Sequence, residues 1–275
     1  MESPSPILVA HLFPELRQYL LSLLRSLTSE EWLLPTSATE WSVKDIALHL
    51  LGGDIGNLSR RRDSHIQNAH ITSWNDLVAF INELNDSWVK ATRRISPRLL
   101  CDLLEFTGPQ METYFASLDP FAMGGAVSWA SPEPAPVWLD VAREYTERWH
   151  HQQQIRDATG RPGLYEKHLF APVLDTFVRA LPHSFREIHA AEGACVQLNV
   201  FGHVENHWIL LRNAETWKLF TGKCTNSTAE VTLAAEDAWK IFTRGIRGEA
   251  AIYKAKIDGE FSLGVKVLET VSVIA

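Results

Sequence analysis

The chain has 275 residues, of which 45% are hydrophobic and 21% charged, and its formal net charge is −7 at pH 7. This length suits two domains or one large one, and the composition is that of a folded globular protein rather than a disordered one. The negative charge lacks the basic excess that phosphate binding requires, which argues against a nucleic-acid partner.

Targeting signals and cysteine usage bear on the cellular compartment. The N-terminal stretch MESPSPILVAHLFPEL has no basic region followed by a long apolar run, and no apolar run approaches the roughly 20 residues of a membrane span. The three cysteines, Cys101, Cys195 and Cys224, are odd in number and lack metal-ligand spacing. We therefore expect a cytoplasmic protein without a membrane partner, whose cysteines are reduced thiols and not nucleophiles.

The first part of the chain has the periodicity of amphipathic helices. Apolar residues recur at steps of three and four, and they predict helices at residues 7–27, 43–65, 73–95 and 97–118. Ser42 and Asp45 form a start to the second helix that resembles a capping box. Together with one later helix, these segments predict a helical bundle.

The second predicted helix carries His49 in its middle. His49 shares a face with Gly52, Gly53 and Gly56, which have no side chains. A glycine inside a helix costs about 1 kcal/mol relative to alanine, so the room that these residues leave should serve a purpose. Either a closely packed neighbouring helix or a cavity beside His49 would explain them, and a lone buried histidine is more often a hydrogen-bonded core residue than a ligand.

A long loop at residues 119–136 precedes the helix predicted between Pro136 and Gly160. Loops of this length are often functional, and we expect this one to cover a site. The helix places Glu147 and His151 one turn apart at the margin of its apolar face, whereas His150 points away from them. A carboxylate and an imidazole at this spacing can form half of a metal site, although an exposed Glu–His pair on a core helix has the same spacing.

The hydrophobic period changes in the second half of the chain. A helix at residues 170–181, within the stretch 168–190, is predicted to bridge the two halves. After it the period falls from about 3.6 to about 2. Strands are predicted at residues 196–200, 208–210, 217–219, 229–233 and 251–257, and helices at 236–243 and 263–272. We therefore predict an α+β fold, with a helical bundle in residues 1–163 and a small α+β layer domain in residues 164–275.

Three short motifs contain or follow the candidate ligands. They are Trp41-Ser42-Val43-Lys44-Asp45, His49-Leu50 and Glu147-Arg148-Trp149-His150-His151-Gln152, the last followed by Arg156, Ala158 and Gly160. These motifs resemble those of the DinB-like four-helix metalloproteins and, more closely, those of the metal-binding domain of the mycothiol-dependent maleylpyruvate isomerase family. The stretch Ala229-Glu230-Val231-Thr232-Leu233, before Asp237-Ala238-Trp239, resembles the sterol-carrier-like C-terminal domain of the same isomerases.

The resemblance implies a site and a chemistry. It implies that His49, Glu147 and His151 bind one divalent metal, most often zinc, and that a low-molecular-weight thiol such as mycothiol is a cofactor. It further implies a small-molecule substrate and an isomerase or S-transferase activity with a metal-activated thiolate or water as the nucleophile. In the isomerase version the thiolate adds to the activated double bond of a dicarboxylate, rotation follows, and the thiolate leaves.

An anionic substrate would also need a cation. Arg60 is a candidate for substrate binding, because it shares the helical face of His49, although it lies about 16 Å further along the axis. Three arginines of the second half are equally open as candidates: Arg212, Arg244 and Arg247.

The alternative is a non-catalytic protein, either one that contains a metal without activity or one whose second half binds an apolar ligand. The second version rests on four aromatic residues, Trp208, Trp217, Phe220 and Trp239. A small domain also needs such residues for its core. The sequence does not distinguish a monomer from a homodimer.

Overall fold

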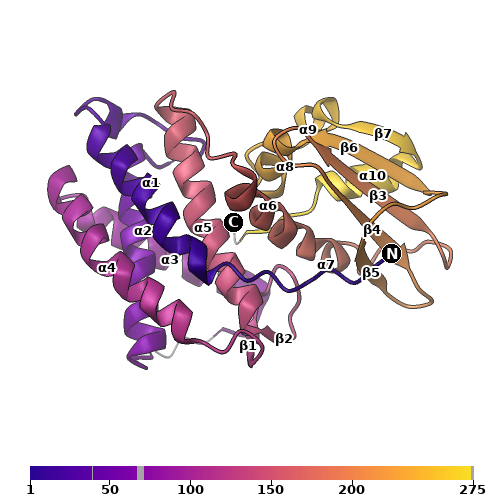
Figure 1. Ribbon diagram of the computed structural model, residues 1–275, viewed down its shortest axis with the longest axis horizontal. Helices are drawn as coiled ribbons and strands as arrows, with labels where there is room; N and C mark the ends of the chain where they lie inside the picture. Colours follow the sequence, from indigo (N-terminus) through magenta and orange to yellow (C-terminus); the bar gives the residue numbers. More distant parts are fainter. Residues whose placement is uncertain (39, 67–70, 274–275) are drawn as a thin grey trace. The chain divides into compact units, whose positions relative to one another are not determined.

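The computed structural model describes residues 1–38, 40–66 and 71–273, and they form two compact units that interleave along the sequence (Figure 1). We name them the helical unit, with the described residues of Val9–Asp119 and Glu144–Leu164, and the sheet unit, with Met1–Leu8, Pro120–Arg143 and Tyr165–Val273. The predicted α+β fold is confirmed. The predicted domain boundary between residues 163 and 164 stays a prediction.

The helical unit is a bundle. It contains η1 (Ala10–Leu12), α1 (Phe13–Ser26), η2 (Glu31–Leu33), α2 (Val43–Asn57), α3 (Trp74–Thr92), α4 (Pro97–Ser117) and, from Glu144 onwards, α5 (Val137–Ala158). In Figure 1 these helices lie side by side, and α1 packs on α4, α4 on α2, and α2 on α3. Their apolar faces enclose a core that includes Leu24, Ile46, Leu51 and Leu104.

Serine side chains determine where three of these helices begin. Ser42, Ser73 and Ser96 precede α2, α3 and α4, and each side-chain oxygen accepts a backbone N–H of the first turn. At α2 the Asp45 carboxylate in turn accepts the backbone N–H of Ser42 at 3.1 Å. The predicted capping box is therefore confirmed.

The second helix is shorter than predicted. α2 ends at Asn57 and continues as the π-helix η3 (Leu58–Arg62), in which the N–H of Asp63 donates to the carbonyl of Leu58 at 3.0 Å. A π turn closes five residues back rather than four, which rotates the residues after Asn57 out of the face that an unbroken α-helix gives them. The prediction of one α-helix to about residue 65 is therefore wrong. Arg60 was placed on the face of His49 on the assumption of an unbroken α-helix, so that placement is wrong as well.

Of the three glycines of α2, one allows a neighbouring helix to pack closely and two border open space. A Cβ atom on Gly52 would lie 2.6 Å from Nε1 of Trp88, so this glycine permits the close packing of α3. The same Nε1 donates to the carbonyl of Leu48 at 2.8 Å. Nothing lies within 4 Å of the positions that a Cβ would take on Gly53 and Gly56, so α2 borders open space there.

The sheet unit contains a five-stranded sheet and a short strand pair. The strands of the sheet are β3 (Cys195–Phe201), β4 (Asn206–Arg212), β5 (Trp217–Thr221), β6 (Ala229–Ala234) and β7 (Lys256–Gly259), in the order β5-β4-β3-β6-β7. Neighbours are antiparallel except β3 and β6, which are parallel. The short pair is β1 (Met123–Ala126) and β2 (Pro134–Pro136), which fall inside the predicted loop 119–136.

Helices accompany the sheet. They are α6 (Lys167–Phe177), η4 (Val178–Ala180), α7 (Leu181–Ser184), α8 (Ala235–Phe242), α9 (Glu249–Lys254) and α10 (Phe261–Leu268). α8 packs on β3 and β6, and α10 packs on β6 and β7 (Figure 1). Across both units, every helix in the described ranges is too short or too polar to cross a membrane.

The strand predicted at residues 251–257 is wrong for most of its length. Residues up to Lys254 form α9, and the ladder with β6 begins only at Lys256, which pairs with Thr232. Ala251, Tyr253, Ala255 and Ile257 alternate with other residues as a strand would, but a pattern this short fits a helix equally well. Whether such a segment forms a strand depends on whether a neighbouring strand pairs with it, and β6 pairs with this segment only from Lys256 onwards. The last helix likewise ends at Leu268 rather than at residue 272.

The core of the sheet unit lies on one face of β3. Val196, Leu198 and Val200 are buried, and they alternate with residues that point to the other face of the sheet. Trp208 and Trp239 are 1% and 2% exposed, so both belong to the core. These two aromatic residues therefore serve packing.

Candidate metal centre

His49 lies in the middle of α2, and the capping box sets where that helix begins. Its imidazole packs against the indole of Trp41, with ring centroids 4.9 Å apart and planes at 39°. Trp41 directly precedes the capping serine, so the loop before α2 supplies one wall for the ring. His49 is partly exposed.

Glu147 and His151 come from successive turns of α5. Oε2 of Glu147 lies 3.3 Å from Nε2 of His151, and their side chains are 27% and 9% exposed. The i, i+4 spacing places both on one face of the helix, as predicted. The pair is therefore not an exposed surface pair: its imidazole is almost fully buried.

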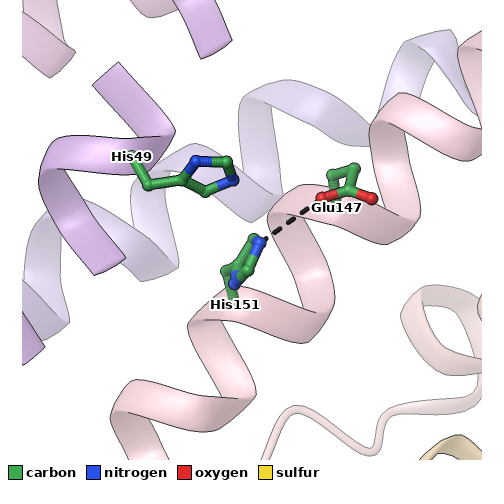
Figure 2. A group of neighbouring side chains, drawn as sticks. All are labelled: His49, Glu147 and His151. Carbon is green, nitrogen blue, oxygen red and sulfur yellow. Dashed lines mark ion pairs between the residues drawn. The ribbon is translucent and has the colours of Figure 1, made fainter. Parts of the chain in front are cut away.

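The three side chains converge although they come from two helices that are distant in sequence. One ligand atom from each of His49, Glu147 and His151 can be chosen so that all three atoms lie within 4.8 Å of one another. Figure 2 shows the imidazole from α2 facing the two side chains from α5. The two rings meet edge to face, with centroids 4.7 Å apart and planes at 73°. The cluster therefore has the shape of a three-ligand cation site.

A further side chain selects the tautomer of His151. Nδ1 of His151 lies 2.8 Å from Oε1 of Gln154. A carboxamide oxygen only accepts, so Nδ1 carries the proton and Nε2 presents its lone pair to the cluster. Gln154 is buried at 9% exposure.

Electrostatics favour the neutral form of the other imidazole. Although the residue as a whole is partly exposed, the loss of water around its ring, followed by the nearby His151, lowers the pKa of His49 to about 3, against the opposing effect of Glu147. His49 is therefore neutral at physiological pH, which is the form that binds a metal ion.

The donor set fits a catalytic metal. Two neutral imidazoles and one carboxylate match the three protein ligands of catalytic zinc sites, which keep a fourth position for water or substrate. Cysteine is absent from the cluster, so the donors do not match a closed structural zinc site. On this ground the residues present fit one divalent ion.

A buried ionic network joins the helices that carry the ligands. Arg148 donates to Asp54 of α2 at 2.6 Å and to Glu144 of α5 at 2.8 Å. Thr107 of α4 donates to the second oxygen of Asp54 at 2.7 Å, and Asn57 donates to Glu144 at 3.1 Å. The network ties α2, α4 and α5 together a short way along the helices from His49 and Glu147.

The same network lies against aromatic rings. The guanidinium of Arg148 is 5.6 Å from the ring centroid of Phe13 and 5.7 Å from that of Phe115. Burial raises the pKa of Asp54, although Arg148 and Thr107 oppose that rise. These buried charges are compensated mainly by one another, so the loss of one partner would be costly.

Other candidate residues lie elsewhere. Arg60 lies in η3 and is exposed. Arg212 ends β4 with its guanidinium over the ring of Trp217, at 5.9 Å from the centroid, and Arg244 has a left-handed backbone with φ of 64°. A substrate-binding role for any of these, or for Arg247, stays a prediction, as does a covering role for residues 119–136.

Sequence reasoning missed two neighbours of the cluster. The i, i+3 spacing of His151 and Gln154 is a signal that could have identified the tautomer-selecting residue. The ring centroid of His150 lies 4.1 Å from that of His151, although His150 is not one of the three residues of the cluster. That His150 points away from the point where Glu147 and His151 converge stays a prediction.

The fold and the three-residue cluster define an α+β protein whose helical bundle carries a candidate metal centre. The mycothiol maleylpyruvate isomerase N-terminal domain family matches residues 13–156, which is more than half of the chain. The chain therefore belongs to this family.

Solved structures extend the likeness to most of the chain. A crystal structure of a histidine-to-alanine variant of the mycothiol-dependent maleylpyruvate isomerase is 12% identical, with a TM-score of 0.55 over 91% of this chain and 92% of that one. A second crystal structure of this isomerase is also 12% identical, with a TM-score of 0.53 over 86% and 88% of the two chains. At this identity the likeness shows the fold alone.

A sterol-carrier likeness is not established for the second half. The crystal structure of a sterol carrier protein 2 like 2 from Aedes aegypti matches 30% of this chain and 80% of its own at 20% identity, with a TM-score of only 0.25. The predicted sterol-carrier-like domain therefore stays a prediction. A comparison with curated protein sequences gives no match.

Proposed function

We propose that this protein is a thiol-dependent isomerase whose catalytic centre is one divalent metal, zinc, bound by His49, Glu147 and His151. The observation that carries the proposal is the convergence of two imidazoles and one carboxylate from two helices. Membership of the isomerase family supports the reaction class. By analogy with the similar structures, whose name is mycothiol-dependent maleylpyruvate isomerase, the cofactor is a low-molecular-weight thiol and the substrate is a small anionic acid with an activated double bond.

The residues of the chain have separate tasks in this proposal. His49 presents a neutral imidazole, and Gln154 holds the ring of His151 in the tautomer that frees Nε2. Glu147 contributes the negative charge that partly balances a divalent cation. These three residues would hold the metal and leave room for one more ligand, and the bound ion would then lower the pKa of a thiol or a water molecule.

Metal content of the purified protein tests the site. We expect about one equivalent of a divalent ion, and a loss of that ion in His49→Ala, Glu147→Gln and His151→Ala. The matched control is His11→Ala, because His11 is an exposed histidine of the same unit. Full metal retention in His151→Ala would refute the proposed ligand set.

Turnover tests the reaction class. The wild-type protein should convert maleylpyruvate to its trans isomer when mycothiol is supplied, and the rate should fall to background without a thiol or after chelation of the metal. Glutathione in place of mycothiol tests how selective the protein is for the thiol. If the metal is present but no thiol supports turnover, the isomerase proposal fails while the metal site stands. A substrate with a leaving group, used in the same assay, distinguishes an S-transferase.

The non-catalytic alternative has little support in the sheet unit. Trp208, Trp217 and Trp239 are at most 4% exposed, and the indole N–H groups of the first two donate to Asp175 and Ile188. These three residues therefore pack in the core, whereas Phe220, the fourth aromatic residue of this alternative, is partly exposed. An apolar molecule found in the native protein by mass spectrometry would reverse this conclusion. Monomer or homodimer, and a cytoplasmic location, stay predictions.

A further inference from the structure

Opposite α8 and α10, the face of the sheet is polar along β3 and β6, and there it carries a pocket of about 360 Å³. Gln197 and Asn199 of β3 alternate with the core residues, and Glu230 and Thr232 of β6 lie beside them in the register. Asn199 donates to Glu230 at 2.7 Å. The other residues around the pocket are Val200, Phe201, Glu205, His207, Lys223 and Cys224. A thiol, that of Cys224, therefore lines a polar pocket of the sheet unit.

The loop after β5 holds Cys224 against β3. The N–H of Cys224 donates to Oε1 of the buried Gln197 at 2.7 Å, and Nε2 of Gln197 donates to the carbonyl of Gly222 at 3.3 Å. At the other end of the loop, the N–H of Thr228 donates to the carbonyl of Cys195 at 2.7 Å, and the N–H of Cys195 donates to Oγ1 of Thr228 at 3.0 Å. The loop is therefore fastened to β3 on both sides of Cys224.

Cys195 and Cys224 are neighbours in space. Cys195 points to the same face of β3 as Gln197, because the two are separated by one residue. Burial, and then a hydrogen bond with the Cys224 thiol, raise the pKa of Cys195 to about 12. Cys195 is 2% exposed, whereas Cys224 is partly exposed and lines the pocket. A reagent in solution can therefore reach Cys224 but not Cys195.

We propose that Cys224 undergoes thiol–disulfide exchange with low-molecular-weight disulfides and that Cys195 then converts the product into an internal disulfide. In the first step the Cys224 sulfur attacks one sulfur of the reagent, forms a mixed disulfide and releases one thiol, which takes the proton. In the second step Cys195 attacks the sulfur of Cys224, and a second thiol leaves with the Cys195 proton. Two cysteines are oxidised, and one disulfide is reduced to two thiols.

The pocket suits the first step, and the position of Cys195 suits the second. The pocket places the ammonium of Lys223 and the carboxylates of Glu205 and Glu230 around Cys224, which suits a zwitterionic disulfide built from amino acids. The hydrogen bond from Cys224 to Gln197 holds Cys224 beside the face of β3 that also carries Cys195, so the second step is intramolecular.

Glutathione disulfide is the probe for a test on the full-length reduced protein. We expect the wild-type protein to lose two hydrogens without retaining glutathione, and peptide mapping without reductant should join Cys195 to Cys224. Cys195→Ser should instead retain one glutathione on Cys224. Cys224→Ser should form neither a mixed disulfide with glutathione nor an internal disulfide. The control is Cys101→Ser, which should behave as the wild type, because Cys101 is buried in α4 of the helical unit.

Two results would overturn the proposal. One is a wild-type protein in which glutathione stays on Cys224 and no internal disulfide forms, because Cys195 would then not react with the mixed disulfide. The other is a wild-type protein in which Cys224 stays a free thiol while an equal concentration of free cysteine is oxidised. Both results come from peptide mapping of the wild type, so they hold even if a serine variant folds poorly. Circular dichroism of each variant shows whether that variant is folded.

Discussion

His151 and Gln154, one helical turn apart on α5, are joined by a hydrogen bond of 2.8 Å between Nδ1 and Oε1. The bond fixes both the tautomer and the plane of an imidazole whose other nitrogen lies 3.3 Å from the carboxylate of Glu147. A residue outside the proposed ligand set therefore determines how one ligand presents its lone pair. Metal-ligating histidines are commonly supported in this way.

Removal of this support should weaken metal binding without unfolding the protein. We expect Gln154→Ala to lower zinc affinity by about 10-fold to 100-fold, the usual effect of losing the hydrogen-bond partner of a ligating histidine. Competition with a chromophoric chelator measures the affinity. Gln18→Ala, at an exposed glutamine of α1, is the matched control and should leave the affinity unchanged. Equal affinities for all three proteins would show that Gln154 has no orienting role.

The buried network around Arg148 should be sensitive to the loss of its cation. Arg148→Met leaves Asp54 and Glu144, each with a side chain 7% exposed, without their main counter-charge. We expect the free energy of unfolding to fall by about 3 to 5 kcal/mol, because an uncompensated charge stays buried. Denaturant titration measures this. Arg25→Met breaks only the exposed pair with Glu105 and should change the free energy of unfolding far less. Comparable losses in both variants would contradict the argument.

The glycines of α2 give a matched set of substitutions. Gly52→Ala places a Cβ against the indole of Trp88, so we expect a loss of about 1 to 3 kcal/mol from overpacking. Gly56→Ala meets no atom within 4 Å and should instead gain up to about 1 kcal/mol from helix propensity. Thermal or denaturant unfolding of the two variants measures both changes in stability. A stabilised Gly52→Ala protein would mean that α3 does not pack against Gly52.

Acid stability should depend on Asp45. Burial alone would raise the pKa of this carboxyl, but hydrogen bonds from Arg93 and Ser42 outweigh it and hold the pKa below its usual value. The stabilisation is therefore fully present above the unfolded pKa of about 3.9 and is lost as the pH falls through the lower folded value. We expect Asp45→Ala to cost about 1 kcal/mol at neutral pH, the size of a helix-capping contact.

A pH series separates this effect from a general loss of stability. The difference in unfolding free energy between wild type and Asp45→Ala should shrink below pH about 4, because the wild-type carboxylate then becomes protonated. Asp86→Ala breaks only the exposed pair with Lys90 and should change little at any pH. A constant difference down to pH about 2 would show that the charge of Asp45 is not what stabilises the start of α2.

Features that depend on neighbours in the sequence were predictable. The capping box of Ser42 and Asp45 uses residues three positions apart, and Glu147 and His151 use the turn of one helix, so local geometry alone brings each pair together. The periodic helices and the first four strands of the sheet followed from apolar spacing in the same way. Where local geometry changes, as at the π turn after Asn57, extrapolation along the helix failed.

Features that join distant segments were decided by tertiary packing. The sequence marked His49 as a candidate only through a family resemblance, and the packing of α2 beside α5 places its ring 4.7 Å from that of His151. Packing also set Trp88 over Gly52, folded the Cys224 loop onto β3, and let the last strand pair only from Lys256. The physical reason is that helix and strand periods determine which face of an element is apolar, whereas the side chains of other elements determine what that face meets.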